Sequence, residues 1–196
     1  MGRETNLGTR LQCRETLSIG RIAGGSTHWT HSVHVATLIL RYSSSTGEAT
    51  VEQGSSHATL KDYPAGSFAT GWTDIVDTSN GVLFYNRDAG KAAVGRLDSS
   101  GNHTTIQEYN NFSRGWTNVV STPNGILFYN RNNGLGAVGR IDGSGNFTTT
   151  RSYHAGAFSP GWTSVYSSPR GIEYRNASTG ARAAGYIDEN GNHVTR

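Results

Sequence analysis

Apolar and polar residues follow one another along this chain in short stretches that recur about every 44 residues. The windows 71–105 and 115–149 are each 35 residues long, align without a gap and are identical at 23 positions. Another copy runs from 161 to 196, and a more divergent copy begins at Trp29. The four tryptophans, Trp29, Trp72, Trp116 and Trp162, are 43, 44 and 46 residues apart. A fixed period in this range indicates an array that stacks one supersecondary unit.

Three turn signals divide each repeat into four segments. The first is an Asn-Gly pair, for which we expect a type I′ hairpin. The second is a glycine after a polar run, and the third is the pattern Asp-x-x-Gly-Asn. The segments between the turns are rich in β-forming residues, and in the third repeat along the chain they predict strands over 117–120, 126–130, 137–141 and 147–152. The turns lie at Asn80-Gly81 and Asn124-Gly125, at Gly90, Gly134 and Gly180, and at 98–102, 142–146 and 188–192.

A four-stranded meander cannot bury both of its faces alone, so neighbouring repeats must cover each other. The pattern therefore predicts an all-β fold, a β-propeller with four recognisable blades at 28–70, 71–114, 115–160 and 161–196. A β-trefoil, which needs three repeats, is the alternative. We expect the tryptophan of each repeat to anchor the packing between sheets. The small residues around Ala92, Ala93 and Gly95 should let sheets approach closely at the third strand.

Residues 1–27 do not repeat cleanly, and we assign them to an N-terminal strand or closure segment. Within them, 19–22 (IGRI) resembles 94–97 (VGRL) of the second repeat, and the last repeat is shorter than the others. One expectation is that 17–22 pairs with the final repeat, giving a composite fifth blade and a closed monomer. The other is an open ring whose sheet edges recruit another chain.

Composition narrows the possible classes of protein further. Apolar residues make up 34%, yet the chain has 26 glycines, 9 tyrosines and 4 tryptophans, a mix that suits short strands and tight turns. The net charge is +3 and basic residues are dispersed, so we expect no nucleic-acid partner. No apolar run is long enough to span a membrane. Cys13 is the only cysteine, which excludes an intrachain disulfide. The first residues lack the apolar core of a signal peptide, and the compartment is not assigned.

Three recurring units carry a family resemblance: Phe68-x-x-Gly71-Trp72-Thr73, the run 80–86 (NGVLFYN) and the run 95–102 (GRLDSSGN). They resemble the repeats of tachylectin-2-like β-propeller lectins, particularly the bacterial members, well over 66–196 and poorly over 28–65. The resemblance implies a propeller, typically of five blades, with one site for an N-acetylated amino sugar such as N-acetylglucosamine on each blade. It is also compatible with secretion. This chain departs from the pattern because it has four recognisable copies, and the first lacks both the Asn-Gly and the Asp-x-x-Gly-Asn turn.

Sugar binding without a metal needs an aromatic face together with planar amide or guanidinium groups. Such residues recur where the second strand of a repeat ends. For the tyrosines and tryptophans the competing interpretation is packing between blades, and for the asparagines it is turn formation. The candidate carbohydrate-binding residues are Trp72, Tyr85, Asn86, Arg87, Trp116, Tyr129, Asn130, Arg131, Trp162 and Asn176.

Other chemistry is poorly supported. Asp98, Asp142 and Asp188 lie in loops with too few carboxylates for a calcium cage, and turn formation explains them better. His28, His31 and His34 would alternate faces on a strand, which disfavours zinc. No catalytic motif is present, so we expect a protein that is not an enzyme and needs no metal or cofactor.

Two functions remain. One is a multivalent lectin that binds glycans, and the other is a non-catalytic scaffold for protein interactions. A lectin keeps its loop residues alike in each copy, and the second and third repeats share Tyr-Asn-Arg.

Overall fold

The computed structural model describes residues 28–196, which form four antiparallel sheets of four consecutive strands each. The first sheet contains β1 (His31–Val35), β2 (Leu38–Tyr42), β3 (Ala49–Gln53) and β4 (Thr59–Tyr63). The second contains β5 (Asp74–Thr78), β6 (Gly81–Asn86), β7 (Lys91–Leu97) and β8 (His103–Tyr109). The third contains β9 (Asn118–Thr122), β10 (Gly125–Asn130), β11 (Leu135–Ile141) and β12 (Phe147–Tyr153). The fourth contains β13 (Ser164–Ser168), β14 (Gly171–Arg175), β15 (Arg182–Ile187) and β16 (His193–Thr195).

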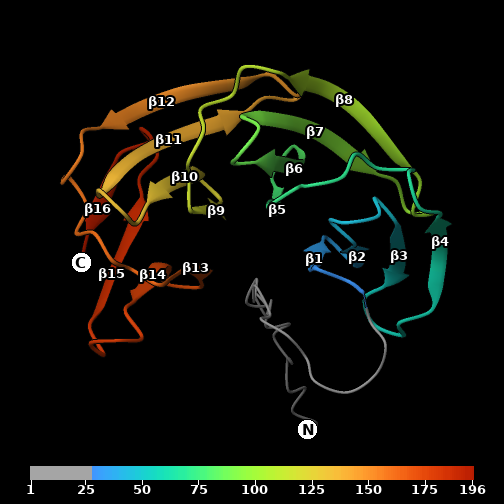
Figure 1. Ribbon diagram of the computed structural model, residues 1–196, viewed down its shortest axis with the longest axis horizontal. Helices are drawn as coiled ribbons and strands as arrows, with labels where there is room; N and C mark the ends of the chain where they lie inside the picture. Colours follow the sequence, from blue (N-terminus) through green and yellow to red (C-terminus); the bar gives the residue numbers. More distant parts are fainter. Residues whose placement is uncertain (1–27) are drawn as a thin grey trace, which may run out of the picture.

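The sheets are arranged as blades around a common centre (Figure 1). The first strand of each sheet lies nearest the centre, and the strands β4, β8 and β12 lie on the outside. This is a four-bladed β-propeller, as the repeat pattern predicts, and the trefoil alternative is wrong. Residues 28–196 contain no helix that could cross a membrane.

Each pair of successive blades shares one apolar core. Leu40, Tyr42 and Val51 of blade 1 pack in one cluster with Ile75 and Phe84 of blade 2. The same register positions meet between blades 2 and 3 and between blades 3 and 4. The tyrosine, leucine and valine on the leading face are fully buried in blades 1, 2 and 3. Burying one such side chain contributes about 1.5–3 kcal/mol, so the interfaces dominate the stability of the fold.

A buried tyrosine hydroxyl joins each blade to the chain that enters the next one. The hydroxyl of Tyr85 donates to the carbonyl of Ser113 at 2.8 Å and accepts from the backbone N–H of Trp116 at 3.3 Å. Tyr42 makes the same pair of bonds with Ala69 and Trp72. Trp72 and Trp116 are themselves buried, which agrees with the anchoring role expected for them. The polar end of each tyrosine is therefore satisfied inside the core.

A second tyrosine fixes the outer edge of each blade to the next. The hydroxyl of Tyr109, at the end of β8, donates to the carbonyl of Gly145 and accepts from the backbone N–H of Phe147. Its target is the turn that begins at Asp142, whose carboxylate accepts from the N–H groups of Ser144 and Asn146. Equivalent turns form at Asp98 and Asp188. Each aspartate thus shapes a turn that is hydrogen-bonded to the preceding blade. The side-chain amide of the asparagine at the end of each turn also donates to the aspartate, and this bond, together with the backbone bonds, holds the pKa of Asp98, Asp142 and Asp188 below its usual range.

The Asn-Gly turn is not of the expected type I′. The pairing of Thr78 with Gly81 makes Ser79 and Asn80 the central residues, and Asn80 is not among the residues with positive φ. Gly81 has φ of 144° because it begins β6 against β7, where a Cβ would lie 2.6 Å from the carbonyl oxygen of Gly95. The glycine is needed for close backbone approach rather than for the turn itself.

The glycine of the third strand also has a different reason from the one predicted. A Cβ on Gly95 would lie 2.1 Å from Nε2 of His103, on the neighbouring strand of the same blade. Gly139 makes the same room for Phe147, and Gly185 for His193. The glycine therefore accommodates a ring within its own sheet, whereas Ala92 and Ala93 are the small residues that lie in the blade interfaces.

The expected closure by 17–22 lies outside the described residues. The final blade has four strands of its own, and its last strand spans only three residues, whereas β8 and β12 span seven. The described residues form three apolar clusters, which join blade 1 to 2, 2 to 3 and 3 to 4.

The pair formed by the ring on the fourth strand and its partner on the second differs among blades 2, 3 and 4, which allows a stability test. In blade 4 the hydroxyl of Tyr174 lies 2.8 Å from Nε2 of His193. In blade 2 the same positions hold Phe84 and His103, and Nε2 of His103 is buried without a partner. The ring pairs have nearly the same geometry, with centroids 5.5 Å apart in blade 2 and 5.8 Å in blade 4. We expect Phe84→Tyr to supply the missing hydrogen bond and to raise the free energy of unfolding by about 1 kcal/mol, measured by urea denaturation.

Blade 3 provides the matched control, because Phe128 there faces Phe147, which has no nitrogen to pair. Phe128→Tyr should be destabilising by about 1–3 kcal/mol, since it buries a hydroxyl without a partner. Equal effects of the two substitutions would contradict this account.

The buried histidines also predict a pH dependence. Burial lowers the pKa of His193 from 6.5 to about 4, and it lowers the pKa of His103 as well. The unfolded chain therefore binds more protons than the folded chain between pH 6.5 and about 4, so stability is fully present above pH 6.5 and falls as the pH drops through this window. The double variant His103→Phe/His193→Phe places at both positions the phenylalanine that blade 3 has at Phe147. Its melting temperature should vary less with pH across the window than that of the wild type. An unchanged slope would refute the assignment.

Candidate functional site

The aromatic residues of the predicted site are structural. Tyr85 and Tyr129 are fully buried, and burial raises the pKa of Tyr85 to about 12. Trp72 and Trp116 are buried as well, and Trp162 is half-buried against Tyr174. These placements favour the packing role over a stacking face for a sugar.

The asparagines of the predicted site organise the turn that follows them. The side-chain oxygen of Asn86 accepts from the N–H of Ala89 at 2.8 Å, and that of Asn130 accepts from Asn132 at 2.9 Å. Asn176 does the same for Ser178, and its Nδ2 donates to the carbonyl of Gly161. All three are partly exposed, yet their side-chain oxygens are committed to the turn.

The two arginines of the predicted site lie in unlike surroundings. Arg87 forms a 3.0 Å ion pair with Asp74, whose carboxylate also accepts from the hydroxyl of Thr73. Burial raises the pKa of Asp74, and the guanidinium opposes that rise. Arg131 is exposed, and the position of Asp74 is taken by Asn118 in its blade. The last repeat has Ala177 instead, so the Tyr-Asn-Arg turn does not form an equivalent site in each blade.

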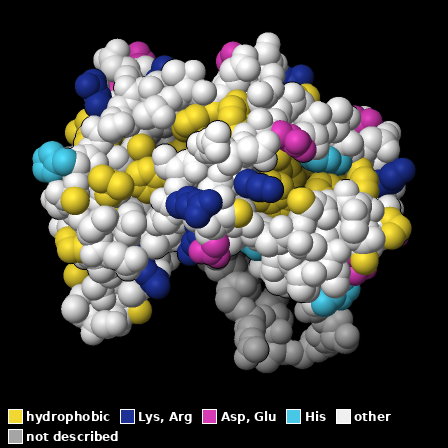
Figure 2. All heavy atoms as spheres, turned by 45° about the horizontal axis from the view of Figure 1, so that its top comes forward, with side chains coloured by type: hydrophobic (Ala, Val, Ile, Leu, Met, Phe, Trp, Pro, Cys, Tyr) yellow, Lys and Arg dark blue, Asp and Glu magenta, His cyan; other side chains and the backbone are white. Residues whose placement is uncertain are grey.

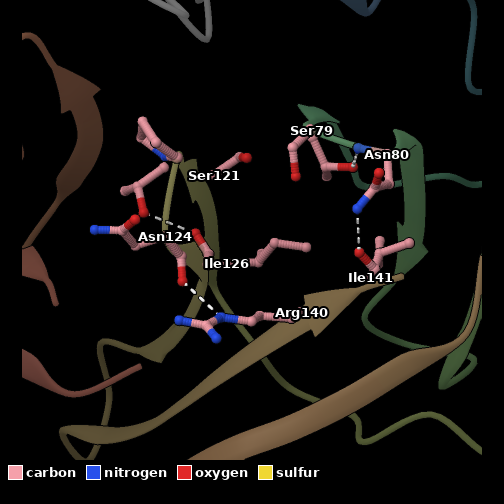
Figure 3. Close-up of a pocket in the computed structure, with 11 residues that line it drawn as sticks. Ser79, Asn80, Ser121, Asn124, Ile126, Arg140 and Ile141 are labelled. Atoms are coloured by element: carbon pink, nitrogen blue, oxygen red, sulfur yellow. Dashed lines mark hydrogen bonds between the residues drawn. The ribbon is translucent and has the colours of Figure 1, made fainter. Parts of the chain in front are cut away.

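Two pockets open at the opposite ends of these strands, where the first and second strands of a blade are joined. One lies between blades 2 and 3, has a volume of about 100 Å³, and is shown in Figure 3. The other lies between blades 1 and 2 and has a volume of about 290 Å³. The sequence pattern at this Asn-Gly pair predicts a hairpin turn and no binding residue. The signal that could have located the pockets was the shared Arg on the third strand.

The two pockets are the same site one blade apart. The strand pairings place each residue of the larger pocket in register with one that lines the smaller. Val35, from the preceding blade, corresponds to Thr78. The other matched pairs are Asp77 and Ser121, Ser79 and Pro123, Asn80 and Asn124, Gly81 and Gly125, Val82 and Ile126, Arg96 and Arg140, and Leu97 and Ile141.

The smaller pocket combines polar side chains with an apolar floor. Nδ2 of Asn80 reaches across from blade 2 and donates to the carbonyl of Ile141 at 2.7 Å (Figure 3). Nε of Arg140 donates to the carbonyl of Asn124 at 3.0 Å, and the same guanidinium also donates to the backbone of Glu189 in blade 4. Hydrogen bonds to two carbonyls hold the guanidinium in place, and Ser121 and Ile126 also line the pocket. Planar and hydroxyl groups over an apolar surface suit a small polar ligand with an apolar face.

The register position between blades 3 and 4 is built differently. Arg170 takes the place of the asparagine, and Tyr186 takes the place of the third-strand arginine. A guanidinium still bonds the carbonyl at this turn, because NH1 of Arg196 donates to the carbonyl of Arg170 at 2.8 Å. Arg196 also lies over the ring of Tyr186, 4.8 Å from its centroid. The cross-blade amide bond is kept at this position, because Nδ2 of Asn124 donates to the carbonyl of Ile187 at 2.9 Å, whereas the third-strand arginine is not kept.

The charges on one face of the molecule and the possible metal ligands of residues 28–196 bear on whether a further site exists. On the face shown in Figure 2 the Lys and Arg side chains are scattered among neutral ones. No three His, Cys, Asp or Glu side chains of the described part of the chain gather as metal ligands would.

Comparison with known proteins supports the fold alone. No protein-family model and no curated protein matches the chain. Among solved structures, a protein from Lactobacillus plantarum superposes with a TM-score of 0.58 at 14% identity, over 86% of this chain and 54% of that one. The computationally designed Ika4 protein gives 0.52 at 12% identity, over 86% and 96%. Hydrazine synthase of Kuenenia stuttgartiensis gives 0.50 at 12% identity, over 90% and 53%. The chain spans about half the length of the Lactobacillus and Kuenenia chains.

The Arg87–Asp74 pair gives a matched prediction. Arg87→Ala leaves a largely buried carboxylate without its partner, and we expect a loss of about 1–2 kcal/mol in the free energy of unfolding, moderated by the partial exposure of the pair. Arg131→Ala removes an arginine that faces no carboxylate at this position and should change stability by less than about 0.5 kcal/mol. Guanidinium chloride denaturation of both variants would show the difference, and equal losses would contradict it.

Proposed function

We propose that the protein is a non-catalytic, multivalent carbohydrate-binding protein whose ligands are glycans that carry N-acetylated amino sugars such as N-acetylglucosamine. The observation that supports this proposal is the recurrence of a pocket with an asparagine and an arginine at matched positions, Asn80 and Arg96 in one and Asn124 and Arg140 in the other. An enzyme needs a single specialised site, whereas a repeated shallow site suits a repeated ligand.

The chemistry of the pocket matches that of an amino sugar. The hydroxyl of Ser121 and the guanidinium of Arg140 offer partners for sugar hydroxyls and for an acetamido carbonyl. The apolar floor formed by Ile126 and Ile141 offers a surface for the methyl group or for the C–H face of the ring. The resemblance of the repeats to those of tachylectin-2-like lectins supports the same class of ligand.

Weak individual sites would act together. Two or more similar pockets on one array of blades raise the effective concentration for the second contact, and avidity on a clustered glycan can exceed the single-site affinity by about 10²-fold or more. We therefore expect weak binding of the monosaccharide and much tighter binding of multivalent glycan surfaces.

A glycan array followed by calorimetry with N-acetylglucosamine tests the function. The array should show binding to surfaces that display the sugar, and calorimetry should give more than one site per chain. Absence of binding to any glycan would refute the proposal, and partners captured in a way that free sugar cannot compete would favour the scaffold alternative.

Ser121→Phe tests the location of the site. Ser121 lines the smaller pocket and no described hydrogen bond of the fold uses its side chain, so the larger ring should block this pocket and reduce the stoichiometry. Ser152→Phe, on the exposed outer strand β12, is the control and should leave binding unchanged. Loss of binding in Arg131→Ala with full binding in Ser121→Phe would place the site at the Tyr-Asn-Arg turn instead.

A further inference from the structure

The residues on the two outward faces of the blade array differ from those at every internal interface. On the leading face, blades 1, 2 and 3 repeat one fully buried set of leucine, tyrosine and valine, which meets the following blade. These residues are Leu40, Tyr42 and Val51 in blade 1, Leu83, Tyr85 and Val94 in blade 2, and Leu127, Tyr129 and Val138 in blade 3.

Blade 4 carries charges at the same register positions. Glu173 replaces the leucine, Arg175 replaces the tyrosine and Ala184 replaces the valine. Arg182 stands where blade 2 has the buried Ala92. The side chains of Arg175 and Glu173 are 49% and 33% exposed, whereas their counterparts in blades 2 and 3 are not exposed at all.

Blade 1 shows the complementary change on its other face. Where blades 2, 3 and 4 present an aromatic ring to the preceding blade, blade 1 has Arg41. Thr50 takes the position of Ala93, and Ser32 takes that of Ile75. The face of blade 1 that meets blade 2 remains apolar, so the polar substitutions gather on the outward side.

The charges on each outward face are paired within that face. Arg41 lies 2.8 Å from Glu52, and the hydroxyl of Thr50 donates to Asp62 at 2.8 Å. In blade 4 the hydroxyl of Tyr166 donates to Glu173 at 2.7 Å, and the guanidinium of Arg175 lies over the Tyr166 ring and 3.7 Å from Glu173. Such faces have their own polar partners and need none from another blade.

We propose that these two faces are caps that end the array at four blades and prevent a second copy of the chain from adding its own blade to either end. An apolar blade face seated on Glu173 and Arg175 would remove both charges from water without offering them new partners. Repeat proteins require terminal units with a polar outer face for solubility, and here the register identifies the residues that supply it.

The direct test gives blade 4 the internal residues of blade 2. Glu173→Leu/Arg175→Tyr/Arg182→Ala should associate as its concentration rises through the micromolar range, whereas the full-length wild type should stay monomeric, both measured by sedimentation velocity. The control Thr104→Leu/Glu108→Tyr places apolar residues on the exposed outer strand β8 and should stay monomeric. A folded triple variant that remains monomeric would overturn the proposal, as would wild-type association that depends on these residues.

A second measurement covers the case in which the triple variant does not fold. Leu127→Glu/Tyr129→Arg moves the cap residues of blade 4 into the interface between blades 3 and 4. If they are incompatible with a blade interface, this variant should lose most of its cooperative thermal transition. A melting temperature within a few degrees of the wild type would show that such charges are tolerated there, and the capping role would be wrong.

Discussion

The structure depends on the tyrosine that each of the first three blades buries against the next. Its ring fills the shared core, and its hydroxyl both donates to a carbonyl and accepts a backbone N–H in the connection that starts the following blade, as Tyr85 does with Ser113 and Trp116. A four-stranded sheet cannot bury two faces alone, so each blade needs this neighbour. The same tyrosine also fixes where the inner strand of the next blade begins, and it therefore sets how successive blades are placed relative to one another.

Periodicity made the fold predictable, because identity at 23 of 35 aligned positions, with no gap, left little freedom in turn placement. The strands expected over 126–130 and 147–152 match β10 and β12 to within one residue at each end. Backbone conformation was harder to predict. Asn80-Gly81 looks like a type I′ turn, yet Thr78 pairs with Gly81, and the glycine serves close approach to Gly95. A dipeptide signal does not reveal which two residues are central, since the cross-strand register decides that.

The site was less predictable for a related reason. Tyr-Asn-Arg contains residue types suited to sugars, but strand direction turns the Tyr85 ring into the blade interface and commits the oxygen of Asn86 to the turn. The pockets combine residues far apart in sequence, such as Asn80 with Ile141, whose contact spans 61 positions. Only the ring arrangement brings a turn of one blade over the third strand of the next, and no local pattern carries that information.

The repeat explains why candidate binding residues and framework residues are hard to separate here. Arg140 lines a pocket and also ties the turn of its own blade to blade 4, and where the third-strand arginine is replaced by Tyr186, Arg196 supplies a guanidinium to the equivalent carbonyl. A guanidinium with five donors can satisfy two carbonyls and still present N–H groups to a ligand. Similarity among repeats is thus expected at these positions for packing alone. Side chains that line a pocket without a described role in the fold, such as Ser121, are therefore the ones whose substitution can separate ligand binding from stability.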